Sequence, residues 1–441
     1  MPTTLHKLTL IVVALTLAST HIYTIDAQDQ AYEYLNEIRS PQPESYRLFG
    51  TAISLWDDRI AISEPGSPDP GHNHTGRVYI MDLTGTPIIT LQPPQPDPGS
   101  NFGISIATGD EFIVVGESNA ETDGKANAGA AHIYDNEGTH ITTLRSPEPY
   151  ETASFGVSLA AHGNLIVVGE PGPYGKDGNI TGKAYVYDST GKLLHTLEQP
   201  QRRLGNYGLD VAISGTAIIV GEPHALVGHD AGKGKAHIYD LDGVLKASID
   251  SPSPGRDITN FGWAVDVGEN IAVVGEVLGD AGNKTMAGIA YIYSLEGRLI
   301  RRVQSPAPSA IGAFGNDATI SDTFIAVSEP RGANAESIGF GCVHLFNLTG
   351  GHFLTIPPPQ GEETSYFGFP LDAMGDTLVT GDLLSREDGE VYAGKVYTYR
   401  INLDPSEEPE STQTNTLYAY VTGAAILMAA LAFWLTRMRR R

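Results

Sequence analysis

An aromatic-glycine pair that returns at a nearly constant interval is the feature that most restricts what this chain can fold into. The pair occurs seven times, with steps of 53, 53, 52, 54, 53 and 53 residues, at Phe49-Gly50, Phe102-Gly103, Phe155-Gly156, Tyr207-Gly208, Phe261-Gly262, Phe314-Gly315 and Phe367-Gly368. A period of this length is typical of repeat architectures, in which each repeat is one supersecondary unit. The chain is therefore expected to contain seven copies of one small module.

Each module has the pattern of four short strands. An alternating segment follows the aromatic-glycine pair, and an apolar run such as Phe112 to Val115 then ends in Gly-Glu-Pro or a variant. A loop rich in Gly, Asn and Asp leads to a third segment, such as Gly182 to Val186, and a turn of the Asp-Gly type opens a fourth. Because no helical periodicity occurs between residues 28 and 416, the predicted fold class is all-β, a seven-bladed β-propeller of four-stranded blades.

The two ends of the repeat array predict a closed ring. The last module has its third strand, Lys395 to Ile401, but no fourth strand. Ala31 to Pro41 precedes the first module and resembles a lone fourth strand, because Leu35 to Pro41 parallels Ile141 to Pro147. We expect this N-terminal strand to complete the last blade, which removes an exposed sheet edge. The propeller is predicted over residues 31–403.

Both termini carry signals of export and anchoring. Lys7 and the apolar run from Leu8 to Ala18 predict a signal peptide over residues 1–27. The uncharged apolar segment 417–436 has the length of one C-terminal transmembrane helix, and the arginines of residues 437–441 predict a basic cytoplasmic tail. Residues 404–416 would form a stalk. The predicted localisation is the cell membrane, as a single-pass type I protein with an extracellular propeller.

The composition argues against nucleic-acid binding and against an internal disulfide bond. The chain has 28 Lys+Arg against 52 Asp+Glu, a formal net charge of −24, and so acidic a surface repels nucleic acid. Its one cysteine, Cys342, excludes an intramolecular disulfide. Since other modules hold Arg77, Ala130 or Lys183 at the same position, we interpret Cys342 as a tolerated substitution rather than a nucleophile.

The repeated motif resembles that of a known family. A Phe-Gly pair followed in the same module by Gly-Glu-Pro resembles the FG-GAP repeat of integrin α-subunit propellers and their prokaryotic relatives, with glutamate in place of the alanine of the name motif. The resemblance covers all seven modules, over residues 49–403. It implies a seven-bladed propeller on a cell surface that takes part in adhesion or ligand recognition.

The same resemblance raises the question of calcium, which several family members carry in Asp-x-Asp-x-Asp-Gly loops. The corresponding loops here, such as residues 175–179 and 279–283, offer one carboxylate each. Calcium takes six to eight oxygen ligands, several of them charged. We therefore predict no cofactor and assign no metal ligand, and calcium stays an open alternative.

An acidic residue ends the second strand of every module, and these acids are the binding-site candidates: Glu64, Glu117, Glu170, Glu222, Glu276, Glu329 and Asp382. Repetition places them at equivalent heights, so one hypothesis is a site for a cation or a basic ligand near the propeller axis. The structural alternative is that each acid caps the following turn by accepting backbone N–H bonds. Sevenfold repetition favours the structural alternative, because catalysis requires one or two blades to diverge.

One position of the third strand alternates between tyrosine and histidine, at Tyr79, His132, Tyr185, His237, Tyr291, His344 and Tyr397. A metal site would need histidines from adjacent blades. No two neighbouring blades both carry histidine, because a blade with tyrosine lies between them. We therefore predict a packed aromatic layer at this position.

Four Asn-x-Ser/Thr acceptors are candidates for glycosylation in an exported chain: Asn73, Asn179, Asn283 and Asn347. The first three precede the third strand of their modules. A loop at that place is expected to be exposed, so a glycan there would leave another face of the propeller for ligands.

No motif of a known catalytic site is present. The sequence lacks a Gly-x-Ser-x-Gly elbow, a His-Glu-x-x-His helix and a Gly-rich phosphate loop that opens a helix, so we predict no enzymatic activity and no catalytic residue. The leading hypothesis is a membrane-anchored surface module for recognition or adhesion, which binds an extracellular protein or glycan non-covalently through propeller loops. The alternatives are a passive acidic component of the cell envelope and a propeller hydrolase that uses axial carboxylates.

Overall fold

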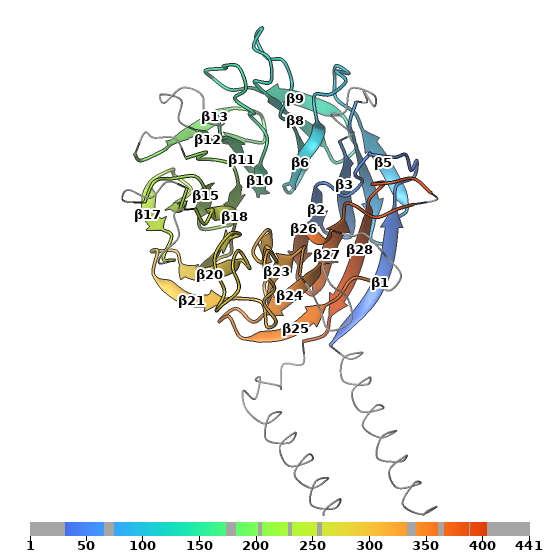
Figure 1. Ribbon diagram of the computed structural model, residues 1–441. Coiled ribbons are helices and arrows are strands. Elements are labelled where there is room, and N and C mark those ends of the chain that lie inside the picture. The colour runs from blue at the N-terminus through green and yellow to red at the C-terminus, as the bar shows by residue number, and fades with distance from the viewer. Residues whose placement is uncertain are drawn as a thin grey trace, which may run out of the picture. The chain divides into compact units, whose positions relative to one another are not determined.

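Seven four-stranded antiparallel sheets make up the described part of the chain, and they are arranged as blades around a common centre (Figure 1). This computed structural model describes residues 31–65, 75–172, 182–201, 205–227, 232–253, 258–332, 341–359, 366–387 and 389–403. The predicted all-β, seven-bladed propeller is therefore confirmed. Strands β2, β6, β10, β18 and β26 lie nearest the centre in Figure 1.

Blades 1 to 3 follow the chain from the inner to the outer strand. They comprise β2 (Ile53–Trp56), β3 (Arg59–Glu64), β4 (Arg77–Asp82) and β5 (Pro87–Leu91), then β6 (Phe102–Thr108), β7 (Phe112–Glu117), β8 (Ala130–Asp135) and β9 (His140–Leu144), then β10 (Leu159–His162), β11 (Leu165–Glu170), β12 (Lys183–Asp188) and β13 (Leu193–Glu198).

Blades 4 to 6 repeat this order. They comprise β14 (Val211–Ile213), β15 (Ile218–Glu222), β16 (Lys235–Tyr239) and β17 (Leu245–Asp250), then β18 (Phe261–Val267), β19 (Ile271–Glu276), β20 (Ile289–Ser294) and β21 (Leu299–Val303), then β22 (Ala318–Ile320), β23 (Ile325–Glu329), β24 (Cys342–Phe346) and β25 (His352–Ile356).

Blade 7 joins the two ends of the chain, as the sequence predicts. It comprises β26 (Phe367–Met374), β27 (Thr377–Asp382), β28 (Lys395–Ile401) and, as its outer strand, β1 (Tyr32–Arg39). Strand β1 runs antiparallel to β28, with Tyr32 opposite Ile401 and Arg39 opposite Lys395. An ion pair of 2.5 Å between Arg39 and Glu387 adds to this closure.

The hydrophobic core lies between the blades. Seven clusters of buried apolar side chains occur in the described residues, and each draws on two neighbouring blades. The cluster between blades 7 and 1 includes Ile38, Phe49, Val379 and Val396. Because a single blade buries its apolar faces only against its neighbours, the closed ring is the stable unit.

The glycine of each aromatic-glycine pair allows neighbouring blades to approach closely. All seven of these glycines have a positive φ, between 81° and 99°, which side chains rarely adopt. At Gly262 of blade 5, a Cβ atom would lie 2.2 Å from the carbonyl oxygen of Lys235 in blade 4. At five of the seven glycines a Cβ atom would lie within 3.0 Å of a carbonyl oxygen of the preceding blade, so the repeated glycine preserves a close backbone contact there.

The predicted terminal segments lie outside the described residues. These are the signal peptide at 1–27, the stalk at 404–416, the transmembrane helix at 417–436 and the tail at 437–441. Within the described ranges, no helix has the length and hydropathy that a membrane crossing requires.

Candidate functional site

All seven acids predicted as candidates are buried, at 4% exposure or less. Each lies fifteen residues before the tyrosine or histidine of the third strand. In blade 2, Glu117 pairs with Ala130 across the two strands, so its carboxylate is diagonal to His132 on the same face of the sheet. The same register holds in the other blades.

Five of the acids bond to the third-strand ring of their own blade. Nε2 lies 2.8 Å from the carboxylate in the pairs His132–Glu117 and His237–Glu222, and 2.9 Å in His344–Glu329. The tyrosine hydroxyl donates at 3.2 Å in Tyr185–Glu170 and at 2.9 Å in Tyr291–Glu276.

The aromatic residue of each Phe-Gly or Tyr-Gly pair completes this unit. It packs against the third-strand ring of the same blade, with ring centroids 5.3 to 6.0 Å apart, in all seven blades. The packed aromatic layer is therefore confirmed. The aromatic residue of the pair, the acid of the second strand and the ring of the third strand thus form one buried cluster, which joins these strands.

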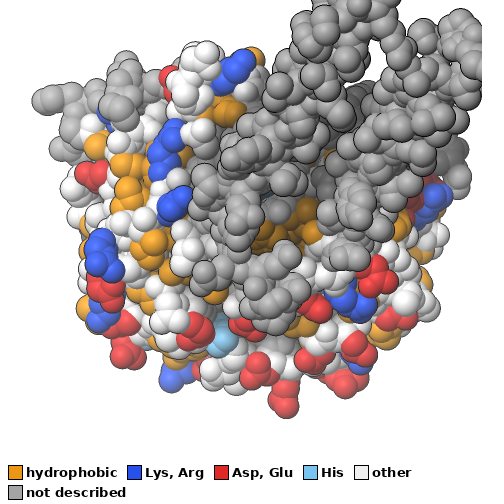
Figure 2. Space-filling model, turned by 90° about the horizontal axis from the view of Figure 1, so that it is seen from below, with side chains coloured by type: hydrophobic (Ala, Val, Ile, Leu, Met, Phe, Trp, Pro, Cys, Tyr) orange, Lys and Arg blue, Asp and Glu red, His pale blue; other side chains and the backbone are white. Residues whose placement is uncertain are grey.

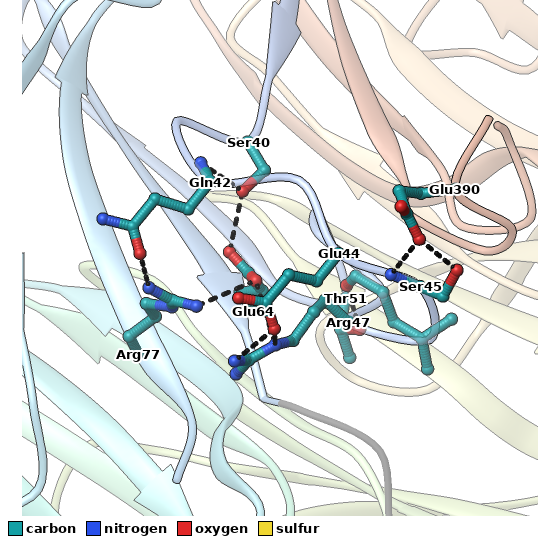
Figure 3. Close-up of polar contacts among 10 residues, drawn as sticks. Ser40, Gln42, Glu44, Ser45, Arg47, Thr51, Glu64, Arg77 and Glu390 are labelled. Atoms are coloured by element: carbon teal, nitrogen blue, oxygen red, sulfur yellow. Dashed lines mark hydrogen bonds and ion pairs between the residues drawn. The ribbon is translucent and has the colours of Figure 1, made fainter. Parts of the chain in front are cut away.

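The acid of blade 1 has basic partners. Figure 3 shows Glu64 among Ser40, Arg47 and Arg77. The Ser40 hydroxyl donates at 2.9 Å, while guanidinium nitrogens of Arg77 and Arg47 lie 3.5 and 3.7 Å away. Burial raises the pKa of Glu64 against the opposing effect of Arg77, Ser40 and Arg47. Burial also raises the pKa of Glu170 to about 7, against the opposing effect of Ser146, Tyr185 and Lys183.

These contacts place the acids within the blades, at the ends of the second strands rather than on the innermost ones. Their bonds go mainly to side chains, whereas the structural alternative expected backbone N–H donors. Among the described residues, Asp382 differs from the other acids because it accepts the N–H of Tyr366 at 2.9 Å. The arrangement suits the fixing of strand ends more than the binding of a ligand at the axis.

A second set of acids, which the sequence analysis did not single out, lies on or just before the innermost strands of blades 4 to 7. Each aspartate accepts one backbone N–H from its own blade through Oδ1. Through Oδ2 each accepts one from the next blade: Asp210 from Val265 (2.8 Å), Asp266 from Ile320 (2.6 Å), Asp317 from Leu371 (2.8 Å) and Asp372 from Leu55 (2.7 Å).

Hydroxyl groups take this place in the other blades. Ser54 bonds to Thr108 at 2.9 Å, Ser105 donates to the carbonyl of Gly156 at 2.7 Å, and Ser158 donates to Asp210 at 3.0 Å. We call the four aspartates the inner clasp. Both of their oxygens are occupied by backbone donors, so they are positioned to hold blades together.

Burial raises the pKa values of the four carboxyl groups in the inner clasp. It raises the pKa of Asp210 and Asp266 to about 6 and that of Asp372 to about 7, and it raises the pKa of Asp317 well above its ordinary value. Neighbouring aspartates of the clasp contribute further, because like charges oppose ionisation.

A third feature is exposed, at the end of the propeller that carries the loops after the second strands. At the junction of blades 7 and 1, the N–H groups of Tyr46, Leu48 and Phe49 donate to the carbonyls of Val391, Tyr392 and Ala393 at 2.9 to 3.1 Å. The hydroxyl of Ser45 also donates to Glu390 at 2.5 Å, as Figure 3 shows. We call this hydrogen-bonded backbone the loop frame.

The loop frame presents two side chains with positive φ to solvent. At the junction of blades 7 and 1 these are Tyr46 and Tyr392, which are 36% and 39% exposed and stack edge to face at 5.3 Å. Equivalent backbone bonds recur at the junctions of blades 2 and 3 and of blades 5 and 6. There the two positions hold Asn127 with Thr152 and Met286 with Ile311, so one backbone carries aromatic, polar or aliphatic pairs.

Two clefts lie between blades 1 and 2. One, of about 130 Å³, opens beside Glu117 and His132. The other, of about 520 Å³, lies at the opposite end of the blades and is lined by Trp56, Arg59 and Ile88 among others. Figure 2 shows part of the surface, where acidic side chains gather along the lower border and hydrophobic ones lie above them.

Two of the four glycosylation candidates can be placed. Asn283 is exposed at a hairpin tip. Asn347 is half-buried, and its Oδ1 accepts bonds from the N–H groups of Thr349 and Gly351. Asn73 and Asn179 lie outside the described residues, as does the predicted calcium-like loop at 175–179. In the loop at 279–283, the single carboxylate, Asp280, accepts the N–H of Met286 at 2.9 Å.

Comparison with known proteins supports the fold. No protein-family model and no curated protein matches the sequence, so the resemblance to FG-GAP repeats stays a resemblance of motif. Among solved structures, the WD40 domain of Pan2 from Neurospora crassa is similar, with a TM-score of 0.51 and 12% identity over 85% of this chain and 97% of that chain. At this identity the likeness shows the propeller fold alone.

Proposed function

We propose that this chain is a membrane-anchored cell-surface recognition module, which binds an extracellular protein or glycan non-covalently. The observation that carries the proposal is the exposed pair Tyr46 and Tyr392 on the loop frame. A backbone held by repeated hydrogen bonds, with side chains that differ from junction to junction, is a rigid scaffold for variable contacts. Tyrosine adds a large contact surface with few rotatable bonds.

The course of the last strand supports this surface as the ligand side. The N–H of Ile401, at the end of β28, donates to the carbonyl of Asp376 in the turn between β26 and β27. Tyr392 precedes the other end of β28. Strand β28 therefore ends on the side of the blade opposite Tyr392.

The proposal includes no catalytic step. The inner clasp is the asymmetric set of perturbed acids that a propeller hydrolase would use, but its oxygens are engaged by backbone N–H groups of two blades. A general acid or base must instead reach a proton of the substrate. The clasp therefore favours a structural role over the hydrolase alternative.

The test is a binding screen with matched variants. The full chain, purified in detergent, is labelled and applied to arrays of glycans and of extracellular protein domains. We expect at least one ligand whose affinity falls tenfold or more in Tyr46→Ala and in Tyr392→Ala, as buried aromatic contacts at interfaces do. Thr152→Ala, at the equivalent position of the junction between blades 2 and 3, serves as the control and should bind normally.

Two results would count against the proposal: no ligand on either array, or a ligand that both tyrosine variants bind with unchanged affinity. Anchoring is tested separately, with an antibody to the propeller applied to intact cells that express the chain. Staining of intact cells supports the surface location, and staining only after permeabilisation contradicts it.

A further inference from the structure

Blade 6 departs from the other blades at the buried acid. The carboxylate of Glu329, the thiol of Cys342 and the imidazole of His344 meet there, and each residue is 3% exposed or less. Nε2 of His344 lies 2.9 Å from Oε2 of Glu329 and 3.2 Å from Sγ of Cys342, while Sγ lies 3.8 Å from the same Oε2. Strands β23 and β24 thus bring three metal-binding side chains to one point.

The direction of these contacts separates a metal site from a catalytic triad. In a nucleophile–histidine–acid triad, the nucleophile and the acid contact different ring nitrogens. Here the thiol and the carboxylate both face Nε2, and Nδ1 is engaged by the hydroxyl of Thr355 at 2.9 Å. The three donor atoms therefore converge on a common centre, as the ligands of a metal ion do.

The carboxylate in blade 6 also lacks a bond that blades 2 and 4, which share its histidine, supply. In blade 2, Oε1 of Glu117 accepts the hydroxyl of Ser100 at 2.5 Å, and in blade 4 Oε1 of Glu222 accepts the amide of Gln199. Among the described residues, Oε1 of Glu329 is buried without a hydrogen-bond partner. A buried carboxylate with an unsatisfied oxygen is destabilising, and the positive charge of a cation held at Oε2 would reduce that cost.

A further shell of bonds holds the imidazole in place. The hydroxyl of Thr355 lies 2.9 Å from Nδ1 of His344 and 3.0 Å from Nε2 of His352. A bond at the second nitrogen is the usual means of orienting a metal-binding histidine.

Blade 2 has the same arrangement without the thiol. Nδ1 of His132 lies 3.0 Å from the hydroxyl of Thr143, which lies 3.1 Å from His140, and the position of Cys342 holds Ala130. Blade 2 therefore shows that the histidine and the acid pack in a blade on their own. What blade 6 adds is the sulfur ligand.

We propose that Glu329, Cys342 and His344 bind one zinc ion inside blade 6. Thiolate, imidazole and carboxylate together are a ligand set that zinc takes in proteins. Ligands of a tetrahedral zinc lie about 3.3 to 3.8 Å apart, so the three atoms reach this geometry with shifts of roughly half an ångström or less. Binding replaces the thiol proton with the metal, and the proton passes to solvent.

The test uses cobalt as a spectroscopic substitute for zinc. The full chain is reduced, freed of metal with a chelator and titrated with Co²⁺. We expect one equivalent to bind with a thiolate-to-cobalt charge-transfer band, which zinc then abolishes by displacement. Cys342→Ala, which gives blade 6 the residue of blade 2, should lose the band and bind at least a hundredfold more weakly, while circular dichroism shows an intact sheet.

Zinc should also raise the melting temperature of the original chain and leave that of Cys342→Ala unchanged. The absence of a charge-transfer band in the folded original chain at any cobalt concentration would overturn the proposal. So would equal cobalt affinity in Cys342→Ala. Neither outcome depends on Tyr46 or Tyr392, so the metal site and the proposed function fail or hold separately.

Discussion

Asp372 of the last blade accepts the backbone N–H of Leu55 in the first blade, with 2.7 Å between Oδ2 and the nitrogen. This bond joins the innermost strands β26 and β2 where the ring closes. On the outer side of the same blade, β1 pairs with β28. The ring is thus closed twice, once by a side chain near the axis and once by a strand at the rim.

Removal of the inner closure should weaken the whole fold. Asp372→Ala leaves the N–H groups of Leu55 and Ala373 without their acceptor, and we expect a loss of about 1–3 kcal/mol in the free energy of unfolding. Urea denaturation of the full chain measures it. Asp376→Ala, which removes an exposed carboxylate from the neighbouring turn, is the control and should change little. Equal stability of the two variants would refute a role for the clasp.

The pH dependence of stability should follow the inner clasp together with Glu170, whose pKa burial also raises to about 7. Burial raises the pKa of Asp210 and Asp266 to about 6 and that of Asp372 to about 7, above the value of about 3.9 in an unfolded chain. The folded state therefore binds more protons than the unfolded state between pH 4 and 7. Its contribution to stability is complete below pH 4 and is lost as the pH rises through 6 to 7.

We accordingly expect the free energy of unfolding to increase from pH 8 to pH 6.5. At lower pH His352, whose pKa is lowered to about 4, opposes this trend. Asp372→Asn, which cannot ionise, should reduce the slope over the upper range. Urea melts at half-unit intervals measure both chains, and a slope that is zero in the original chain or identical in Asp372→Asn contradicts the assignment.

The aromatic-glycine pairs should tolerate no side chain at the glycine. In Gly262→Ala the new Cβ would lie 2.2 Å from the carbonyl of Lys235, in addition to the strain of φ +86°. Gly282→Ala is a matched control, because Gly282 has φ +62° but nothing within 4 Å. We expect Gly262→Ala to lower the melting temperature well beyond Gly282→Ala. Similar melting temperatures would show that the blades separate easily at this contact.

Glycan attachment should distinguish the two placed acceptors. The side chain of Asn283 is exposed, while Asn347 uses Oδ1 to hold its own turn through Thr349 and Gly351. For the chain produced in eukaryotic cells, we expect Asn283→Gln to remove one glycan and Asn347→Gln to leave the attached glycan mass unchanged. Mass spectrometry before and after deglycosylation measures this. A glycan on Asn347 would contradict the expectation and would show that the asparagine is modified before its turn forms.

The blade count and the pairing of the chain ends could be predicted because both follow from the periodic repeat in the sequence. The aromatic of each pair, the acid and the third-strand ring recur in constant register, so their common environment followed from one repeat. The position of the core between the blades could not be predicted in this way. Residues such as Phe49 and Val379, far apart in sequence, meet only because the ring closes, and alternation within a strand says nothing of which blade covers it.

The inner clasp escaped detection for a different reason. Asp210 and Asp317 follow the repeat glycine by two residues, whereas Asp266 and Asp372 follow it by four, and blades 1 to 3 use serine or threonine instead. The acids are therefore not periodic, although their hydrogen bonds are equivalent. Likewise, Cys342 looks like a tolerated substitution until its distance to His344 is known.

The pairing of β1 with β28 also sets an order of events during synthesis. Of the described strands, β1 leaves the ribosome first, and it cannot pair until β28 has followed, because more than three hundred residues separate Arg39 from Lys395. Until then the nascent chain exposes one unpaired strand and one incomplete blade, both open to misassociation. The ring of blades can therefore close only after β28 has left the ribosome, and the fold becomes cooperative at that stage.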